Sequence, residues 1–142
     1  MKDEITIVVP CKNEESYIYY LLDSLKKQKG IEGIKIVIAD CSTDNTRKVI
    51  ENHKEWLNVK IIKGGPVSVA RNNGSYLTTT PYILFIDADV RFFSNTVIYD
   101  TLKQMKDEDL HLIGLNIKCY DSDLRAQLSF SIFNVLNKIL SK

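Results

Sequence analysis

Two aspartates separated by one residue, Asp87 and Asp89, follow directly on an apolar run at residues 82–86. The run is rich in strand-forming residues, which predicts a central strand covered on both faces. Open parallel sheets bind their ligands just beyond the carboxyl ends of the strands. Two neighbouring carboxylates repel each other, and a hard cation such as Mg²⁺ or Mn²⁺, held together with a substrate phosphate, would relieve that repulsion. The spacing therefore indicates a metal site; the alternative is a solvated loop whose aspartates cap the next element.

Polar residues also follow two other runs of strand-forming residues. These residues are Pro10, Asn13 and Glu14 after the run 5–9, and Asp40 after the run 34–39. In a sheet of parallel strands they would lie at the same edge as the two aspartates, so residues remote in sequence could converge on one ligand. Asp40 could accept a hydrogen bond from a base or a ribose, whereas residues 42–44 could equally cap a helix.

Strand and helix patterns alternate along the whole chain. The expected strands cover residues 5–9, 34–39, 59–62, 82–86 and 110–119. The expected helices are one capped by Asn13 or Ser16 and stopped at Gly30, one starting at Ser42 or Thr43, two at 66–76 and 95–105, and one at 122–140 capped by Asp121 or Ser122. Alternation with short loops implies parallel strands joined by crossover helices. We therefore predict an α/β fold, a mostly parallel sheet with helices on both faces, in one domain over residues 1–142.

The composition describes an ordinary soluble domain. The chain has 142 residues, of which 44% are hydrophobic and 26% are charged, and its formal net charge is +1. Such a balance gives no electrostatic reason to expect a nucleic-acid partner. The charged start does not resemble a signal peptide, and no run reaches the roughly 20 apolar residues that span a bilayer. Three cysteines without metal-ligand spacing suit a reducing cytosol. We expect a cytoplasmic protein, at most peripheral at the inner face of the membrane.

The predicted last helix has a wide apolar face. Its apolar residues are Leu128, Phe130, Ile132, Phe133, Val135, Leu136, Ile139 and Leu140. Packing into the core is one interpretation of this face. The other is an interface, through self-association, with missing protein or with a membrane surface, because wide apolar faces need cover.

Four motifs stand in a fixed order along the chain. They are VVPCKNEE at 8–15, IADCSTDNT at 38–46, ARNNG at 70–74 and IDAD at 86–89. In this order they resemble the family 2 glycosyltransferases, whose GT-A fold is Rossmann-like, and the resemblance covers about residues 5 to 118. It implies the nucleotide-sugar-binding portion of an inverting, metal-dependent enzyme. Such an enzyme transfers a sugar from a nucleotide-diphosphate sugar, typically a UDP-sugar, to a hydroxyl of a saccharide or lipid-linked acceptor.

The resemblance also implies roles for the residues of the first three motifs. Pro10, Asn13 and Glu14 would border the nucleotide. Asp40 would bind the base, typically uracil through its ring N–H. Arg71 would line the same pocket near the base or the diphosphate, and its alternative role is an ion pair with an aspartate at a strand end.

In the last motif, Asp87 would contact the ribose or the metal, Ala88 would line the nucleotide-sugar site, and Asp89 would coordinate the Mg²⁺ or Mn²⁺ that bridges the diphosphate. The cation would neutralise charge on the leaving diphosphate. An inverting transferase also needs a general base for the acceptor hydroxyl, which this family supplies after the last predicted strand. The chain offers Asp121 and Asp123 there, and both are better interpreted as helix caps. We therefore assign no catalytic residue and expect a truncated chain that lacks most of the acceptor-binding half.

Two other functions remain open at this point. An Asp-x-Asp motif after an apolar strand also occurs in phosphatases of the haloacid dehalogenase type, where Asp87 would be the nucleophile. That interpretation requires an early nucleophile motif and downstream Lys and acidic motifs, which do not stand out in the sequence. The missing general base leaves a non-catalytic nucleotide-binding module as the second alternative.

Overall fold

The computed structural model describes residues 1–118 and 124–140. These residues belong to two compact units, 1–102 and 103–142. The single domain expected over the whole chain is not tested by this division and stays a prediction.

A four-stranded parallel sheet with the strand order β3-β2-β1-β4 forms the centre of the first unit. Its strands are β1 (Ile5–Cys11), β2 (Lys35–Asp40), β3 (Val59–Lys63) and β4 (Tyr82–Phe85). Every neighbouring pair runs parallel, as in the register of Val9 with Ile38 between β1 and β2. This confirms the predicted α/β fold and its parallel sheet.

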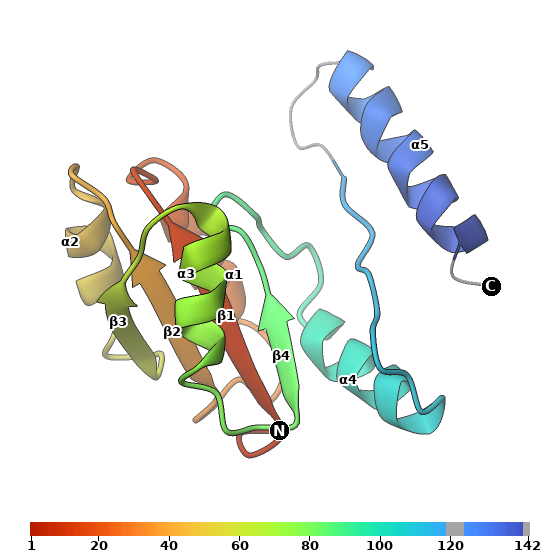
Figure 1. Ribbon diagram of the computed structural model, residues 1–142, viewed down its shortest axis with the longest axis horizontal. Coiled ribbons are helices and arrows are strands. Elements are labelled where there is room, and N and C mark those ends of the chain that lie inside the picture. Colours follow the sequence, from red (N-terminus) through yellow and green to blue (C-terminus); the bar gives the residue numbers. More distant parts are fainter. Residues whose placement is uncertain (119–123, 141–142) are drawn as a thin grey trace. The chain divides into compact units, whose positions relative to one another are not determined.

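The helices of the chain are α1 (Ile18–Lys26), α2 (Thr46–Glu51), α3 (Val67–Ser75), α4 (Val97–Asp107) and α5 (Leu124–Leu140). Figure 1 shows α3 on one face of the sheet and α1 on the other. The alternation of side chains along β1 explains both layers. Ile7 and Val9 belong to the apolar core together with α1, α2 and the first turns of α4. Val8 points to the opposite face, against α3.

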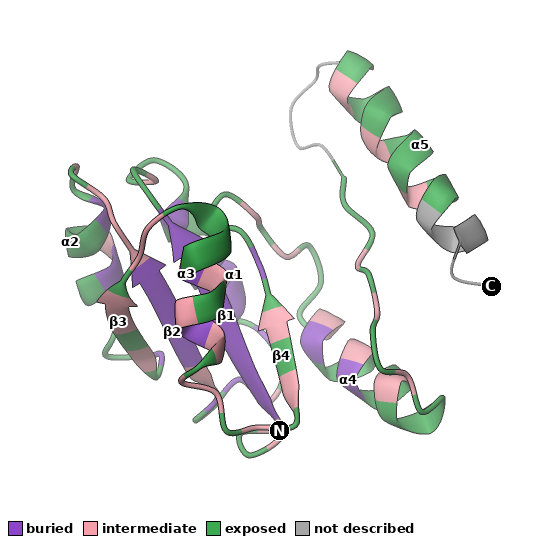
Figure 2. Cartoon of the chain, in the orientation of Figure 1, coloured by how far each residue is buried: buried purple, intermediate pink, exposed green. Residues whose placement is uncertain are grey.

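The two central strands are buried almost throughout. Every residue of β1 is buried, and so are the four inner residues of β2 (Figure 2). Strands covered on both faces read as continuous apolar runs, which is why the sequence identified these two so clearly.

Strand β4 is an edge strand, so the expectation of a central strand at residues 82–86 was wrong. Among the described residues β4 pairs with β1 alone, and Ile83 and Phe85, which lie on the same face of the strand, are 36% and 44% exposed. The strand expected at 110–119 is not formed over residues 110–118, which the structure describes. An apolar pattern cannot specify whether a ladder partner lies beside it, and without a partner no strand exists.

Several expected helix caps are also wrong. The helix α1 begins after Tyr17 with no side-chain cap, and Asn13 instead adopts a left-handed conformation with φ 56°. The next helix, α2, starts at Thr46 rather than at Ser42 or Thr43. Local polar side chains serve here to join two loops, as described below, and this competes with helix capping. The expected caps Asp121 and Ser122 lie outside the described residues.

In the second unit, α5 confirms the predicted last helix. Asn134 of α5 binds both backbone groups of Ile117: its Nδ2 donates to the carbonyl at 2.7 Å, and its Oδ1 accepts from the N–H at 3.1 Å. Several apolar side chains of this helix, among them Leu128, Ile132 and Val135, are exposed. Whether this face packs into the core stays a prediction. Across the described residues, no helix combines the length and apolarity needed to cross a membrane.

Candidate functional site

The candidate site lies at the carboxyl edge of the sheet, where β1, β2 and β4 end. Pro10 is buried inside β1, although it has no N–H for the ladder. The carbonyl of Val8 accepts from the N–H of Ile86, so backbone groups at every second residue of β1 face β4. Pro10 faces the same side, but β4 has already ended at Phe85, and no ladder bond is lost.

Two loops lie side by side at this edge, one after β1 and one after β2. The N–H of Asn13 donates to Ser42 Oγ at 2.8 Å, and the N–H of Thr43 donates to Asn13 Oδ1 at 2.8 Å. The N–H of Glu14 donates to Thr46 Oγ1, also at 2.8 Å. These reciprocal bonds explain the left-handed conformation of Asn13, which short polar side chains tolerate. The structure thus places Asn13 and Glu14 at the carboxyl edge of the sheet, where the Asn13 side chain holds the two loops together.

Thr46 was not identified from the sequence, yet it is the buried centre of this junction. Its hydroxyl accepts from Glu14 and donates to Asp44 Oδ1 at 2.5 Å, while its N–H donates to the same oxygen at 3.0 Å. The hydroxyl bond from Thr46 lowers the pKa of the Asp44 carboxyl. Asp44 thus binds the first residue of α2, whereas the N-cap position belongs to Asn45, which makes no side-chain cap bond. A threonine flanked by polar residues gives no signal in sequence that distinguishes this role.

Asp40 ends β2 and lies next to a tight crossing of the chain. Its Oδ1 accepts the N–H of Ser42 at 3.0 Å, and its backbone carbonyl accepts the N–H of Gly64 at 2.9 Å. A Cβ atom at Gly64 would lie 2.6 Å from the carbonyl oxygen of Ala39, so only glycine allows this approach. Within the described residues, Asp40 Oδ2 has no hydrogen-bond partner, and it can accept a bond from a ligand.

Arg71 reaches the site from α3 and pairs with Asp87. Its Nη2 lies 2.7 Å from Asp87 Oδ1, and the two side chains are 40% and 55% exposed. The helix can approach the sheet this closely because Ala70 and Gly74, four residues apart on its inner side, are small. The alternative role considered for Arg71, an ion pair with a strand-end aspartate, is therefore present in the structure. The Nε of Arg71 is buried and has no hydrogen-bond partner.

The Asp87-Ala88-Asp89 turn directs its two carboxylates outward. Ile86 and Ala88 are buried, whereas Asp87 and Asp89 are exposed, and the N–H of Val90 closes the turn on the Asp87 carbonyl at 3.3 Å. This alternation anchors the turn through its apolar residues and leaves both carboxylates accessible to a ligand.

Glu14 is a third carboxylate, close enough to Asp87 and Asp89 to interact with their charges. Burial raises the pKa of Glu14, and the negative charges of Asp89, Asp44 and Asp87 raise it further. The turn after β4 and the loop after β1 therefore form one acidic region, as their position at the same edge of the sheet predicted.

The carboxylates at this edge of the sheet could bind a hard cation, but they do not surround a cation site by themselves. Within residues 1–118 and 124–140, no group of three or more His, Cys, Asp or Glu side chains is arranged to hold a metal ion. Mg²⁺ is commonly held by one or two carboxylates together with substrate phosphates, which Asp87 and Asp89 could provide with a bound diphosphate. The residues present therefore fit a cation that arrives with a phosphorylated ligand.

The sequence left open whether Cys11 and Cys41 are close, and the structure places them beside each other. The N–H of Cys41 donates to the Cys11 carbonyl at 3.1 Å, and both thiols are free. Burial, followed by the charge of Asp40, raises the pKa of Cys11 to about 12. Because the thiolate is the reactive species, Cys11 is inert at neutral pH.

Known proteins are similar to this chain in sequence and in fold. Poly(ribitol-phosphate) beta-N-acetylglucosaminyltransferase TarS of Staphylococcus aureus is 36% identical over 93 residues, which are 61% of this chain and 16% of that protein. The processive diacylglycerol beta-glycosyltransferase of Mycoplasma genitalium is 29% identical over 122 residues, covering 82% of this chain and 36% of the relative. The chain thus spans well under half the length of these relatives.

The crystal structure of S. aureus TarS 1–349 in complex with UDP is similar in fold, with a TM-score of 0.67 and 28% sequence identity. The match covers 75% of this chain and 33% of that one. The family described as "Glycosyl transferase family 2" matches residues 6–138, nearly the whole sequence. The order of the motifs, the parallel sheet and these matches agree, and the chain belongs to glycosyltransferase family 2.

Proposed function

We propose that this chain is the donor-binding part of an inverting, metal-dependent glycosyltransferase that uses a UDP-sugar. The observation that carries the proposal is the convergence of Asp40, the Arg71–Asp87 pair and Asp89 at one edge of the sheet. The similarity to TarS 1–349, which was crystallised with UDP, supports the choice of nucleotide. Membership of a glycosyltransferase family argues against the haloacid dehalogenase alternative, in which Asp87 would be a nucleophile.

The nucleotide would lie between the β1 loop, the end of β2 and α3. Asp40 Oδ2, which has no hydrogen-bond partner among the described residues, would accept the ring N–H of uracil, while Pro10 and the Asn13-Glu14 backbone would border the nucleotide. The hydrogen bonds between the β1 and β2 loops hold these groups in place before a ligand binds. Such preorganisation saves part of the ordering cost of binding. The guanidinium of Arg71 would donate to the nucleotide from the other side.

Asp89 and Asp87 would hold Mg²⁺ or Mn²⁺ together with the diphosphate. Asp89 is the main ligand in this proposal, because one carboxylate oxygen of Asp87 already forms an ion pair with Arg71. When bound, the cation supplies Lewis-acid neutralisation of the charge on the leaving diphosphate. Glu14 completes the acidic region, and the attraction of a cation would offset the repulsion among the three carboxylates.

The reaction proposed is a single displacement at the anomeric carbon. The oxygen of an acceptor hydroxyl forms a bond to that carbon on the face opposite the diphosphate, and the bond from carbon to diphosphate oxygen breaks. The hydroxyl proton passes to a general base, and UDP leaves with the bonding electron pair. We assign no residue of this chain as that base; Asp121 and Asp123 lie outside the described residues.

The proposal also includes the acceptor and the location of the protein. A saccharide or a lipid-linked acceptor suits the relatives, one of which is named for diacylglycerol. The exposed apolar side chains of α5 suit self-association or a peripheral membrane contact of a cytoplasmic protein.

Isothermal titration calorimetry with UDP, with and without Mn²⁺, tests the proposal. The wild-type chain should bind UDP more tightly with Mn²⁺ than without it, and Asp89→Ala should abolish that difference. Glu32→Ala is the matched control, because Glu32 is an exposed acid in the turn before β2, at the opposite edge of the sheet. The proposal fails if the wild type does not bind UDP, or if Asp89→Ala binds UDP and Mn²⁺ as the wild type does.

A further inference from the structure

The helix α1 and the turn that follows it carry two buried polar side chains that serve no residue of the donor site directly. Ser24, within α1, is 5% exposed, and Gln28, two residues beyond the end of α1, is 3% exposed. Most side chains on this side of the helix are apolar and belong to the core. Two buried polar groups in such a place require hydrogen-bond partners, and these partners identify what the groups do.

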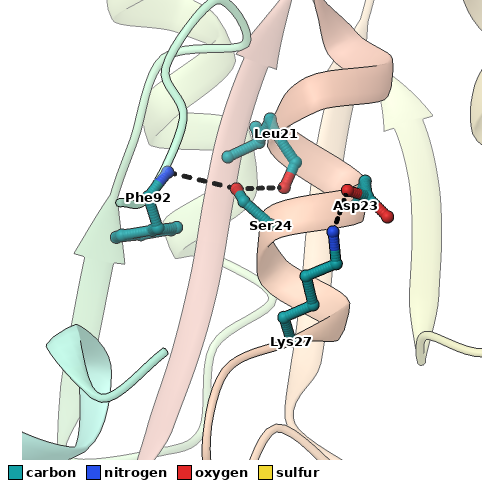
Figure 3. A network of polar contacts seen from close by, with 5 residues as sticks. All are labelled: Leu21, Asp23, Ser24, Lys27 and Phe92. Atoms are coloured by element: carbon teal, nitrogen blue, oxygen red, sulfur yellow. Dashed lines mark hydrogen bonds and ion pairs between the residues drawn. The ribbon is translucent and has the colours of Figure 1, made fainter. Parts of the chain in front are cut away.

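Ser24 binds the segment that follows the Asp87-Ala88-Asp89 turn. The Ser24 hydroxyl donates to the carbonyl of Leu21 at 2.9 Å within α1 and accepts the N–H of Phe92 at 3.1 Å. Figure 3 shows the hydroxyl between these two groups, next to the exposed ion pair of Asp23 and Lys27. The contact lies three residues beyond Asp89, while the Phe92 side chain packs against the core.

Gln28 binds the same segment at two further points. Its Nε2 donates to the carbonyl of Ser94 at 2.6 Å, and its Oε1 accepts the N–H of Ile98 at 3.3 Å. The backbone N–H of Lys29 adds a bond to the carbonyl of Asn95 at 2.6 Å. Donor and acceptor of one amide are thus both used, and the segment from 92 to 98 is held at successive backbone groups.

This arrangement connects the two acidic parts of the site through one rigid element. The β1 loop with Glu14 leads directly into α1, and α1 holds the segment that begins after Asp89. The turn itself is anchored on its other side by Ile86 and Ala88. Fixing the chain on both sides of the aspartates restricts their positions relative to Glu14, as ligand sites require of their supporting groups.

We propose that Ser24 and Gln28 are positioning residues for cation-dependent donor binding, acting through the backbone of residues 92–98 on Asp89. The proposal rests on the proposed function and adds two residues that touch neither nucleotide nor cation. Their loss should leave the binding of UDP alone unchanged, because Asp40 and Arg71 lie on other elements. It should weaken the additional affinity that Mn²⁺ gives.

The test compares Ser24→Ala and Gln28→Met with the wild-type chain by two measurements. In hydrogen exchange, the amides of Phe92 and Ile98 should exchange about tenfold faster in the respective variant, because each loses its acceptor. In calorimetry, the ratio of the UDP Kd without Mn²⁺ to that with Mn²⁺ should fall at least about threefold in each variant, as for a lost supporting group.

Lys27→Ala is the matched control, since it removes the exposed ion pair beside Ser24 and leaves both buried contacts intact. In this variant, the ratio of the UDP Kd without Mn²⁺ to that with Mn²⁺ should equal the ratio of the wild type. Ser24→Thr keeps the hydroxyl, so its ratio of UDP Kd values without and with Mn²⁺ should lie closer to that of the wild type than to that of Ser24→Ala. If Gln28→Met does not fold, Ser24→Ala, which removes a single oxygen, decides the question.

The outcomes separate this inference from the function on which it rests. If the wild type shows no Mn²⁺-dependent gain in UDP affinity, the proposed function is overturned and the positioning role with it. If the wild type shows the gain and the variants retain it in full while Phe92 and Ile98 exchange faster, the positioning role alone is overturned. Equal loss of binding with and without Mn²⁺ would also overturn it, since a general structural role predicts that result.

Discussion

Replacing Gly74 by alanine should destabilise the chain, because α3 has no room for a methyl group at this position. A Cβ atom there would lie 2.3 Å from Val8 Cγ1 and 3.3 Å from Val8 Cγ2. Carbon atoms in contact prefer about 3.5–4.0 Å, so either α3 must move from β1 by about 1 Å or Val8 must leave its rotamer. Val8 is completely buried and cannot turn into solvent.

Two opposing contributions set how much free energy of unfolding Gly74→Ala loses. Overpacking of a core costs typically about 1–3 kcal/mol. Alanine is favoured over glycine in a helix interior by up to about 1 kcal/mol, but Gly74 is the last residue but one of α3, where the gain is smaller. The severity of the clash places the net loss at roughly 1–2 kcal/mol. Since α3 also carries Arg71, a displaced helix should weaken the Arg71–Asp87 ion pair and with it UDP binding.

Urea unfolding followed by circular dichroism measures the loss, and a double-mutant cycle with Val8→Ala tests its cause. Val8→Ala alone should cost about 2 kcal/mol as a buried large-to-small change. In the double variant the new methyl occupies the space that Val8 leaves, so the combined loss should be smaller than the sum by at least about 1 kcal/mol. Additive losses, equal to the sum within about 0.5 kcal/mol, would refute the packing explanation.

Three further predictions concern the loops of the site. Gly64→Ala should lower the unfolding midpoint in urea clearly more than Gly65→Ala. A Cβ atom at Gly64 would lie 2.6 Å from the Ala39 carbonyl oxygen, whereas a Cβ atom at Gly65 would make ordinary contacts, from 3.4 Å. Equal losses in the two variants would contradict the close crossing at Gly64. Thr46→Val should cost about 1–3 kcal/mol by leaving the N–H of Glu14 without its acceptor, and Thr46→Ser, which keeps the hydroxyl, should cost less in the same assay. Glu14→Gln should raise the thermal midpoint at pH 7. Burial first, and then the neighbouring aspartates, raise the pKa of Glu14 in the folded chain above its ordinary 4.5. Above this pH, ionisation of Glu14 therefore disfavours the folded state, and glutamine removes that penalty. The gain should shrink as the pH falls towards 4.5 and be lost below it, and a gain that does not depend on pH between 4 and 7 would contradict this cause.

The fold could be predicted largely because its central strands are simple in sequence. The runs at 5–9 and 34–39 are apolar on both faces, and such runs match buried parallel strands. The run at 82–86 has the same character, and it forms an edge strand instead. The pattern at 110–118 forms no strand in the structure. In both cases the outcome depends on which neighbour lies beside the backbone, a property that no local pattern contains.

The candidate site could be predicted in outline for a different reason. Asp40, Asp87 and Asp89 each follow a strand pattern directly, so the topology alone places them at one edge. The supporting residues could not be identified in this way. Thr46, Ser24 and Gln28 are ordinary helix residues in sequence, and their importance arises from backbone groups to which they bind across the fold.

By itself, the sequence determined the alternation of strands and helices, the family and the acidic residues at the ends of the strands. Periodicity and motif order are local properties, and a single chain displays them without being folded. Only the tertiary structure decided that Arg71 pairs with Asp87, that Gly74 brings α3 against Val8, and that α1 supports the segment after Asp89. These contacts join residues far apart in the chain, and they depend on side-chain volume and on hydrogen-bond geometry, which exist only once the layers are packed.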